Sequence, residues 1–368
     1  MSRSVPRRRA APPPRRNGAG SGSGIGIDLA ARIERIGSSR VPVVALVLLV
    51  LVGLGALAAC VAEVGPDHPG PNHSGPDYFC GAASVVIVTA YSWALAARTG
   101  GRPVVTGTVA LVLGTVVVVS DDDSLRTGAA VLTCVVSAVL AVMATVPAVR
   151  FVHAVREVVV AVLVAAVGAL ATIGFEPVVT VARFEYVTLG LAFVGVFAVV
   201  YRLGAGLHGL GRRGVLIVLI GTAVLALTLV YAEALRRYGT PALVDSLLDT
   251  VAWSRDNLGA FPRPIESVLG IPALAWGTHM RARRRQGWWV CAFGVAATTP
   301  VANALVNPSI TLVEGALSVL YGVVVGLMIG FVVIRIDLAI TGPPGRRGRR
   351  SEEAGALRPE PARTLPLL

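Results

Sequence analysis

The sequence predicts an all-α fold, a polytopic transmembrane helix bundle of about ten membrane-spanning helices with the N-terminus and the C-terminus inside. Three observations support this fold class. The 368 residues are 54% hydrophobic and 15% charged, whereas a soluble domain is about a quarter charged. Apolar stretches long enough to cross a bilayer recur from Val41 to about Ile336. The connections between these stretches alternate between arginine-rich and acid-rich segments.

Ten apolar runs approach the roughly 17–25 residues that a helix needs to cross a membrane. They predict spans near 41–62, 79–97, 104–120, 127–149, 158–175, 187–203, 215–235, 264–280, 287–306 and 312–336. Helices are expected because only helices and closed barrels satisfy their backbone in lipid, and the runs lack the alternation of barrel strands. The run 264–280 is the least regular, since it is short and holds Glu266 and Pro272.

The charges in the connections predict the orientation. With the N-terminus inside, 27 of the 33 basic residues, all of them Arg, fall in inner segments, and 14 of the 21 acids fall at the outer face. Cytoplasmic connections are enriched in Lys and Arg, so both termini are expected in the cytoplasm. The formal net charge of +12 is divided between the two sides, and it therefore does not indicate a nucleic-acid partner.

Both ends of the chain are predicted to be disordered cytoplasmic tails outside a bundle that covers residues 41–338. Residues 1–40 are rich in Arg, Pro and Gly, and residues 339–368 are again polar and arginine-rich. Such segments bury too little apolar surface to offset the entropy of ordering. Their arginines are expected to contact anionic lipid headgroups.

An outer amphipathic segment is predicted over 241–258. Pro241 suits the first turn of a helix, and an apolar stripe runs along one side, with Trp253 near the end. The pattern is typical of a helix that lies flat on the outer leaflet. Asp245 and Asp249 lie one turn apart on the other side, either as an acid/base or metal pair or, as we favour, as part of a solvated face.

A polar stripe near the C-terminal end is the candidate substrate-binding site. Thr299, Asn303 and Asn307 are spaced four apart on one helical face, and Pro300 is expected to kink the helix beside them. Glu314 begins the next helix and is expected across a short hairpin. An ionisable group near membrane depth is a functional hypothesis, but the alternative that we favour is that these groups only join helices through hydrogen bonds.

Two cysteines are candidates for a disulfide. Cys60 and Cys80 are both expected at the outer face, an oxidising location. The alternative is a lipoprotein-type processing site at Cys60, which the long basic leader and the nine later spans disfavour. Cys134 and Cys291 fall within predicted helices and are expected to act as small apolar residues.

The loop between the first two spans holds four residues of metal-ligating type. These are Asp67, His68, His73 and Asp77. A solvated turn explains them better than a metal site, because nothing in the spacing enforces a coordination geometry. We predict no metal and no cofactor.

Small residues at intervals of four predict close helix packing or dimerisation faces. They are Gly322, Gly326 and Gly330 in the last span, and Ala161, Ala165 and Ala169 in the fifth.

The sequence does not name a reaction. Phosphate-binding, metalloprotease and nucleophile-elbow motifs are absent, so we lean against an enzyme. The leading hypothesis is a non-catalytic scaffold or accessory subunit in envelope processes of the bacterial cytoplasmic membrane, with the lipid bilayer and a membrane protein or a second copy as partners. One alternative is a secondary transporter for a small solute. Another is an enzyme that acts on lipid-linked envelope precursors through outer-face carboxylates.

Overall fold

The structure is a computed structural model. It describes residues 41–64, 78–120, 122–178, 180–205, 207–283, 287–307, 309–342, 348, 354–355 and 360–367. The chain divides into two compact units, Met1–Ala45 and Leu46–Leu368. In the first unit only residues 41–45 are described, and they are helical. The tail predicted over residues 1–40 therefore lies outside the described residues, and the account below concerns the second unit.

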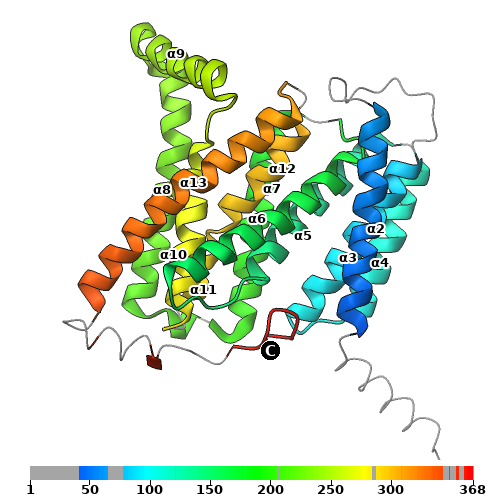
Figure 1. Ribbon diagram of the computed structural model, residues 1–368, viewed down its shortest axis with the longest axis horizontal. Helices are drawn as coiled ribbons and strands as arrows, with labels where there is room; N and C mark the ends of the chain where they lie inside the picture. Colours follow the sequence, from blue (N-terminus) through cyan, green and yellow to red (C-terminus); the bar gives the residue numbers. More distant parts are fainter. Residues whose placement is uncertain are drawn as a thin grey trace, which may run out of the picture. The chain divides into compact units, whose positions relative to one another are not determined.

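Every regular element among the described residues is a helix, as predicted (Figure 1). In chain order they are α2 (Val41–Val64), α3 (Tyr78–Arg98), α4 (Pro103–Ser120), α5 (Asp123–Met143), α6 (Phe151–Ile173), α7 (Val181–Val200), η1 (Tyr201–Ala205), α8 (Leu207–Tyr238), α9 (Pro241–Leu258), η2 (Ile265–Gly270), α10 (Ile271–Arg281), α11 (Gly287–Ala292), α12 (Val295–Val306) and α13 (Leu312–Thr341). The elements η1 and η2 are π-helical turns.

Nine helices in the described part of the chain are long and apolar enough to cross a membrane. They correspond to every predicted span except 264–280. That segment is shorter. It consists of the six residues of η2, which continue directly into the eleven residues of α10. Its helical length is about 25 Å, somewhat less than a hydrocarbon core of about 30 Å. The predicted ten spans are thus nine long helices and one short segment.

The chain that precedes the short segment is partly buried against α13. Gly259 ends α9 with a left-handed φ of 77°. Ala260 is fully buried, and the Ser318 hydroxyl of α13 donates a hydrogen bond of 2.6 Å to the Phe261 carbonyl. Residues 259–263 thus connect α9 to η2 without a helix, with Ala260 buried and the next three residues partly buried.

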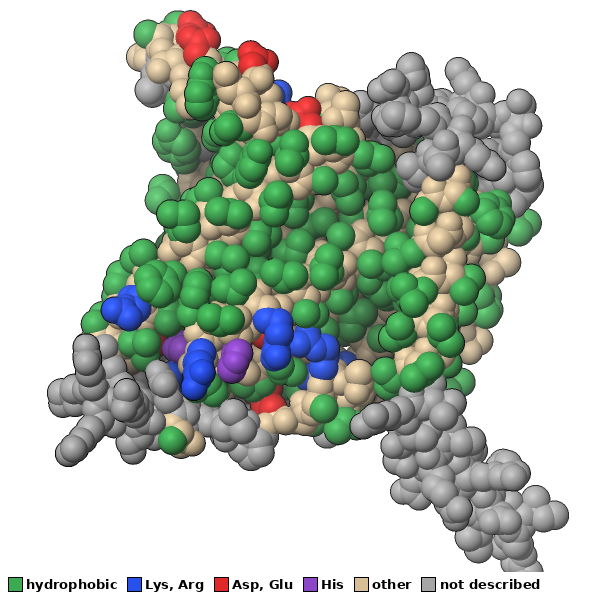
Figure 2. All heavy atoms as spheres, viewed as in Figure 1, with side chains coloured by type: hydrophobic (Ala, Val, Ile, Leu, Met, Phe, Trp, Pro, Cys, Tyr) green, Lys and Arg blue, Asp and Glu red, His purple; other side chains and the backbone are tan. Residues whose placement is uncertain are grey.

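The connections gather at two ends of opposite charge. The arginine-rich end is defined by Arg98, Arg102, Arg150, Arg156, Arg281 and Arg283. The acid-rich end is defined by Asp122, Asp123, Glu176, Asp256 and Glu314. Figure 2 shows hydrophobic side chains across the middle of one face, Arg and His near the lower edge and most acidic side chains near the upper edge. This separation agrees with the charge alternation read from the sequence.

The centre of the bundle is a pair of segments, η2–α10 and α11–α12. The run Gly287–Val306 is 89% buried, more than any other long apolar stretch. Helices α5, α6, α7 and α13 contact this central pair. Small buried residues such as Ala154, Ala275 and Ala297 allow the helices to approach closely.

Helix α9 has the bounds predicted for the outer amphipathic segment. Most of its side chains are exposed, including Trp253 at 60%. Its C-terminal end is attached to α13, because the Tyr321 hydroxyl donates to the Leu258 carbonyl at 2.8 Å. Arg255 also forms an ion pair with Glu314 at 3.1 Å. Figure 1 shows α9 crossing the end of α8.

Part of the C-terminal tail is packed on the bundle. The Leu367 amide donates to the Arg98 carbonyl at 2.8 Å, and Glu360 pairs with Arg281 at 2.6 Å. Residues 360–367 are therefore held by specific contacts, and the expectation of disorder over 339–368 is wrong for this part. Composition predicted disorder because it counts apolar surface, whereas a few charged anchors hold this segment.

Candidate functional site

Two interrupted helices lie side by side at the centre of the bundle. The first is η2–α10, which starts with a π-helical turn. The second is broken at Phe293 and Gly294, whose amides bond to carbonyls three residues earlier. Gly270 lies so close to Ala297 that an added Cβ would be 2.2 Å from the Ala297 nitrogen. The sequence predicted a distortion at Pro300, but the break precedes this residue, which lies inside α12.

The Glu266 carboxylate lies between these elements and α13. The residue is 0% exposed, and neither carboxylate oxygen has a hydrogen-bond partner among the described residues. An ionised carboxylate without a partner costs several kcal/mol to bury. Single π-helical turns also occur frequently at functional sites. Glu266 is therefore the strongest candidate for a functional ionisable group in the described chain.

The glycine ladder of α13 makes room for this carboxylate. A Cβ at Gly322 would lie 2.8 Å from the Glu266 Cδ, so any larger residue would collide with the carboxyl group. Gly326 faces Ile271 and Gly330 faces Ala275. The ladder Gly322–Gly326–Gly330 thus packs against η2 and α10 within this chain. Residues Ala161, Ala165 and Ala169 are likewise buried in the core of the same unit.

Arg263 supplies positive charge close to Glu266. It lies three residues earlier, in the partly buried chain before η2. Its carbonyl accepts a hydrogen bond of 2.8 Å from the Ser267 hydroxyl. The charges of Glu185 and Glu266 both act on its guanidinium. The entrance to the site from the acid-rich end therefore carries one cation and two carboxylates.

Two residues of the predicted polar stripe belong to the central pair. Asn303 is 2% exposed, and neither atom of its amide group has a partner among the described residues. Thr299 is fully buried, and its hydroxyl donates to the Val295 carbonyl of its own helix at 2.7 Å. Asn303 on α12 therefore adds a second unsatisfied polar group to the neighbourhood of η2, which α12 contacts. Buried groups of this kind are rare and need an explanation.

The other two residues of the stripe are engaged elsewhere. The Asn307 side chain accepts bonds from the Ser309 amide at 3.0 Å and hydroxyl at 2.7 Å, which closes the turn after α12. The Glu314 amide is capped by the Thr311 hydroxyl, and its carboxylate pairs with Arg255 of α9. Glu314 therefore pairs with α9, whereas the sequence placed it only across a short hairpin from the stripe. Spacing along one helix could not reveal the position of α9.

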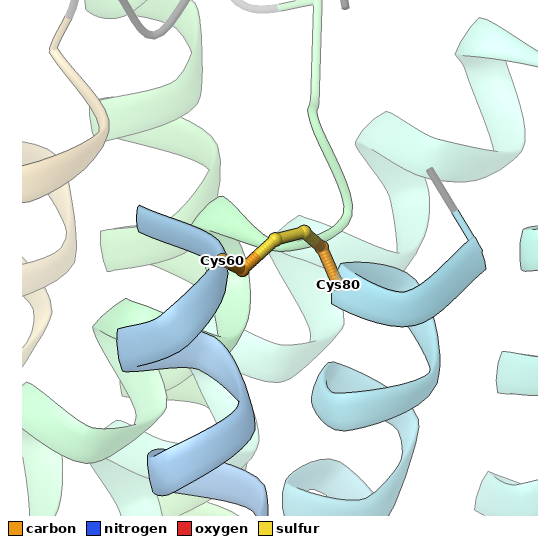
Figure 3. The surroundings of a disulfide bond; sticks show 2 residues. All are labelled: Cys60 and Cys80. Carbon is orange, nitrogen blue, oxygen red and sulfur yellow. A yellow bond between two sulfur atoms is a disulfide. The ribbon is translucent and has the colours of Figure 1, made fainter. Parts of the chain in front are cut away.

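The structure joins Cys60 of α2 to Cys80 of α3 in a disulfide (Figure 3). Their Cα atoms are 6.0 Å apart, within the usual range for such a bond. Cys134 and Cys291 are free and buried. The loop that holds Asp67, His68, His73 and Asp77 lies outside the described residues.

Thiol counting tests the pairing of Cys60 with Cys80. Alkylation of the denatured, unreduced protein is expected to modify two cysteines, rising to four after reduction, as read by intact mass. A Cys60→Ser variant serves as the control, because it frees Cys80 and gives three reactive thiols before reduction. Closing a loop of this length contributes about 3 kcal/mol to stability. Four reactive thiols without reduction would contradict the bond.

The acidic residues at the acid-rich end are those considered for metal binding or acid/base chemistry. In the described ranges no group of three His, Cys, Asp or Glu side chains is placed to hold a metal ion. Asp122 caps α5 by accepting the Leu125 amide at 3.0 Å. Asp245 and Asp249 line a shallow hollow on α9 with Trp253.

One feature of the sequence could have identified Glu266 as a functional candidate. A single carboxylate inside an apolar run of ten or more residues is unusual. In the sequence alone, the same carboxylate also makes the run 264–280 the least regular of the predicted spans. The burial of Glu266 depends on Gly322, which is 56 positions later in the chain, so only the fold reveals the enclosure.

Comparisons with known proteins give no guide to this site. No family model, curated protein or solved structure matches the chain.

Proposed function

We propose that this chain is a multi-pass protein of the bacterial cytoplasmic membrane that carries a small solute in exchange or symport with protons or a monovalent cation. The observation that carries the proposal is the enclosed Glu266 carboxylate, which has no hydrogen-bond partner among the described residues. Arg263 supplies positive charge nearby, but with no hydrogen bond to either oxygen from the described residues, the buried carboxylate is further stabilised by a proton or a bound cation. Loading and unloading that charge is the elementary step of a coupled carrier.

The position of Glu266 supports the same function. Gly322, which contacts it, lies about a third of the way along α13, so the carboxylate is well inside the bundle. Carriers commonly place their ion and substrate sites near mid-depth, between discontinuous helices. The interruptions before Ile271 and at Gly294 provide two such helices in contact. Asn303 offers an amide for hydrogen bonding to a solute.

Reconstituted vesicles test this function directly. The purified protein is placed in liposomes that contain a pH-sensitive dye, and a panel of small solutes is added outside. We expect at least one class of solute to change the internal pH, and an imposed pH gradient to accelerate uptake of that solute. A protein that moves neither protons nor sodium with any member of the panel would contradict the proposal.

Labelling at the two ends of α4 tests the orientation. In a background that lacks Cys134 and Cys291, a membrane-impermeant maleimide is expected to label Ser124→Cys on intact cells. It is expected to leave Arg102→Cys unlabelled until the cells are permeabilised. Both positions are exposed and flank the ends of this helix. The reverse pattern, or labelling of both positions, would overturn the membrane map.

A second candidate, a non-catalytic scaffold or accessory subunit, is favoured by the surface of α8. Only 6% of its apolar window Gly214–Tyr231 is buried. Leu219, Leu227 and Val230 are among the exposed side chains, and the close contact of Gly221 with Phe293 lies on another side. A partner that co-purifies in mild detergent, and is lost when Leu219 and Leu227 become Ala, would support this role. Purification without a partner would favour the carrier.

A further inference from the structure

The arginine-rich end holds a second site, built around the buried guanidinium of Arg281. This residue is 1% exposed, and it donates to the Thr145 hydroxyl at 2.7 Å and to the Thr145 carbonyl at 3.1 Å. Its guanidinium carbon lies 3.5 Å from the centre of the Trp288 ring. The remaining donor edge faces Glu360, whose carboxylate oxygens lie 2.6 and 3.5 Å from Nη2 and Nε. This is the two-point geometry by which Arg binds carboxylates and phosphates.

The carboxylate in this site comes from the C-terminal tail. Glu360 is the only carboxylate that the described residues pair with Arg281. The bundle itself satisfies the rest of the guanidinium through Thr145 and Trp288. The site is therefore preformed by the bundle, and its anion is supplied by a segment 79 residues later in the chain.

Two further anchors hold the tail at the same end. Arg98, which is 3% exposed, donates to the carbonyls of Ala362 and Leu365. Arg363 of the tail pairs with the fully buried Glu157 at 2.9 Å. Removing the tail would take away the carboxylate that pairs with Arg281 and free the donor edge that it occupies. That edge would then be open to an anion from outside the chain.

We propose that residues 360–367 are a tethered, displaceable ligand of an oxyanion-binding site formed by Arg281, Thr145 and Arg98. The ligand class that fits is a phosphate or a phosphate monoester, whose oxygens reproduce the Glu360 carboxylate on a fork of Arg donors. The source is either soluble phosphate or the headgroup of an anionic lipid at the membrane surface. The inference does not depend on the carrier function, because it concerns the opposite end from Glu266.

Hydrogen exchange of the tail measures its displacement. The full chain is studied in lipid nanodiscs, and the reporter is the amide of Leu367, which is bonded to the Arg98 carbonyl. We expect slow exchange in phosphatidylcholine discs and at least about tenfold faster exchange in a Glu360→Gln, Arg363→Gln double variant. Thr364→Ala is the matched control. This tail residue is exposed and is not one of the anchoring residues Glu360 and Arg363, so the substitution should leave exchange unchanged.

Two additions distinguish the source of the anion. Inorganic phosphate that accelerates exchange in phosphatidylcholine discs, while chloride at equal ionic strength does not, identifies a soluble oxyanion. Acceleration only in phosphatidylglycerol discs identifies a lipid headgroup. In either case Arg281→Gln should abolish the response to the anion. Equal acceleration by chloride would overturn the proposal. So would a tail that stays protected with phosphate in both kinds of disc, or one that stays protected in the double variant.

Discussion

Replacement of Glu266 by Gln is expected to abolish coupled transport while the protein still folds. The substitution keeps the shape of the side chain and removes only its ability to ionise. Because the carboxylate is enclosed by η2, α12 and α13, no other described side chain replaces it at this position. The carrier cycle requires a proton or a cation to bind to this carboxylate and to leave it. Without the carboxylate, solute-driven proton flux should fall on the order of 100-fold, the equivalent of about 2.7 kcal/mol.

The measurement is the change in internal pH of proteoliposomes after solute addition, compared at equal reconstituted protein. Glu314→Gln is the matched control. This carboxylate belongs to α13, which also contacts Glu266, but it is paired with the half-exposed Arg255. Exposed ion pairs contribute little, so this variant should keep most of the flux and nearly the same Tm. Flux in Glu266→Gln that equals the wild type would show that Glu266 is only a buried structural group.

The sequence was sufficient to predict the helical bundle, and the reason is physical. Nine of the predicted apolar runs agree with long helices in the described part of the chain. A long apolar run that is to lie in lipid must close its hydrogen bonds within the segment, and a helix does so. The bounds of α9 could be predicted from Pro241 and the stripe that follows it. The short segment 264–280 was harder, since its start depends on how the preceding residues pack against α13, where Ser318 bonds to the Phe261 carbonyl.

The candidate site was only partly predictable from the sequence. Thr299 and Asn303 could be identified because residues four apart share a helical face. The partner of Glu314 could not be predicted, because Arg255 comes from α9, and no periodicity along α12 or α13 specifies that contact. The docking of Glu360 on Arg281 was also hidden, since it joins residues 79 positions apart. Local patterns therefore identify faces, while long-range pairs require the fold.

Gly270→Ala is expected to be the most destabilising single substitution in the central pair. An added Cβ would lie 2.2 Å from the Ala297 nitrogen, 2.4 Å from the Ala296 carbonyl carbon and 2.6 Å from the Ala297 Cα. All three atoms belong to the backbone of α12, so no side-chain rotation relieves the collision. The two interrupted helices would have to separate, and overpacking of this kind costs about 3 kcal/mol or more.

The measurement is the Tm of the purified protein in detergent, which should fall by roughly 4 °C or more for a chain of this size. Gly190→Ala on α7 is the matched control, because its Cβ would meet nothing within 4 Å. In an open helical position Ala is favoured over Gly by up to about 1 kcal/mol, so the control should keep or slightly raise the Tm. Since the same contact holds η2 beside α12, a Gly270→Ala protein that survives purification should also lose coupled flux. Two variants with equal Tm values would mean that the central helices do not touch at this point, and the enclosure of Glu266 would lose its support.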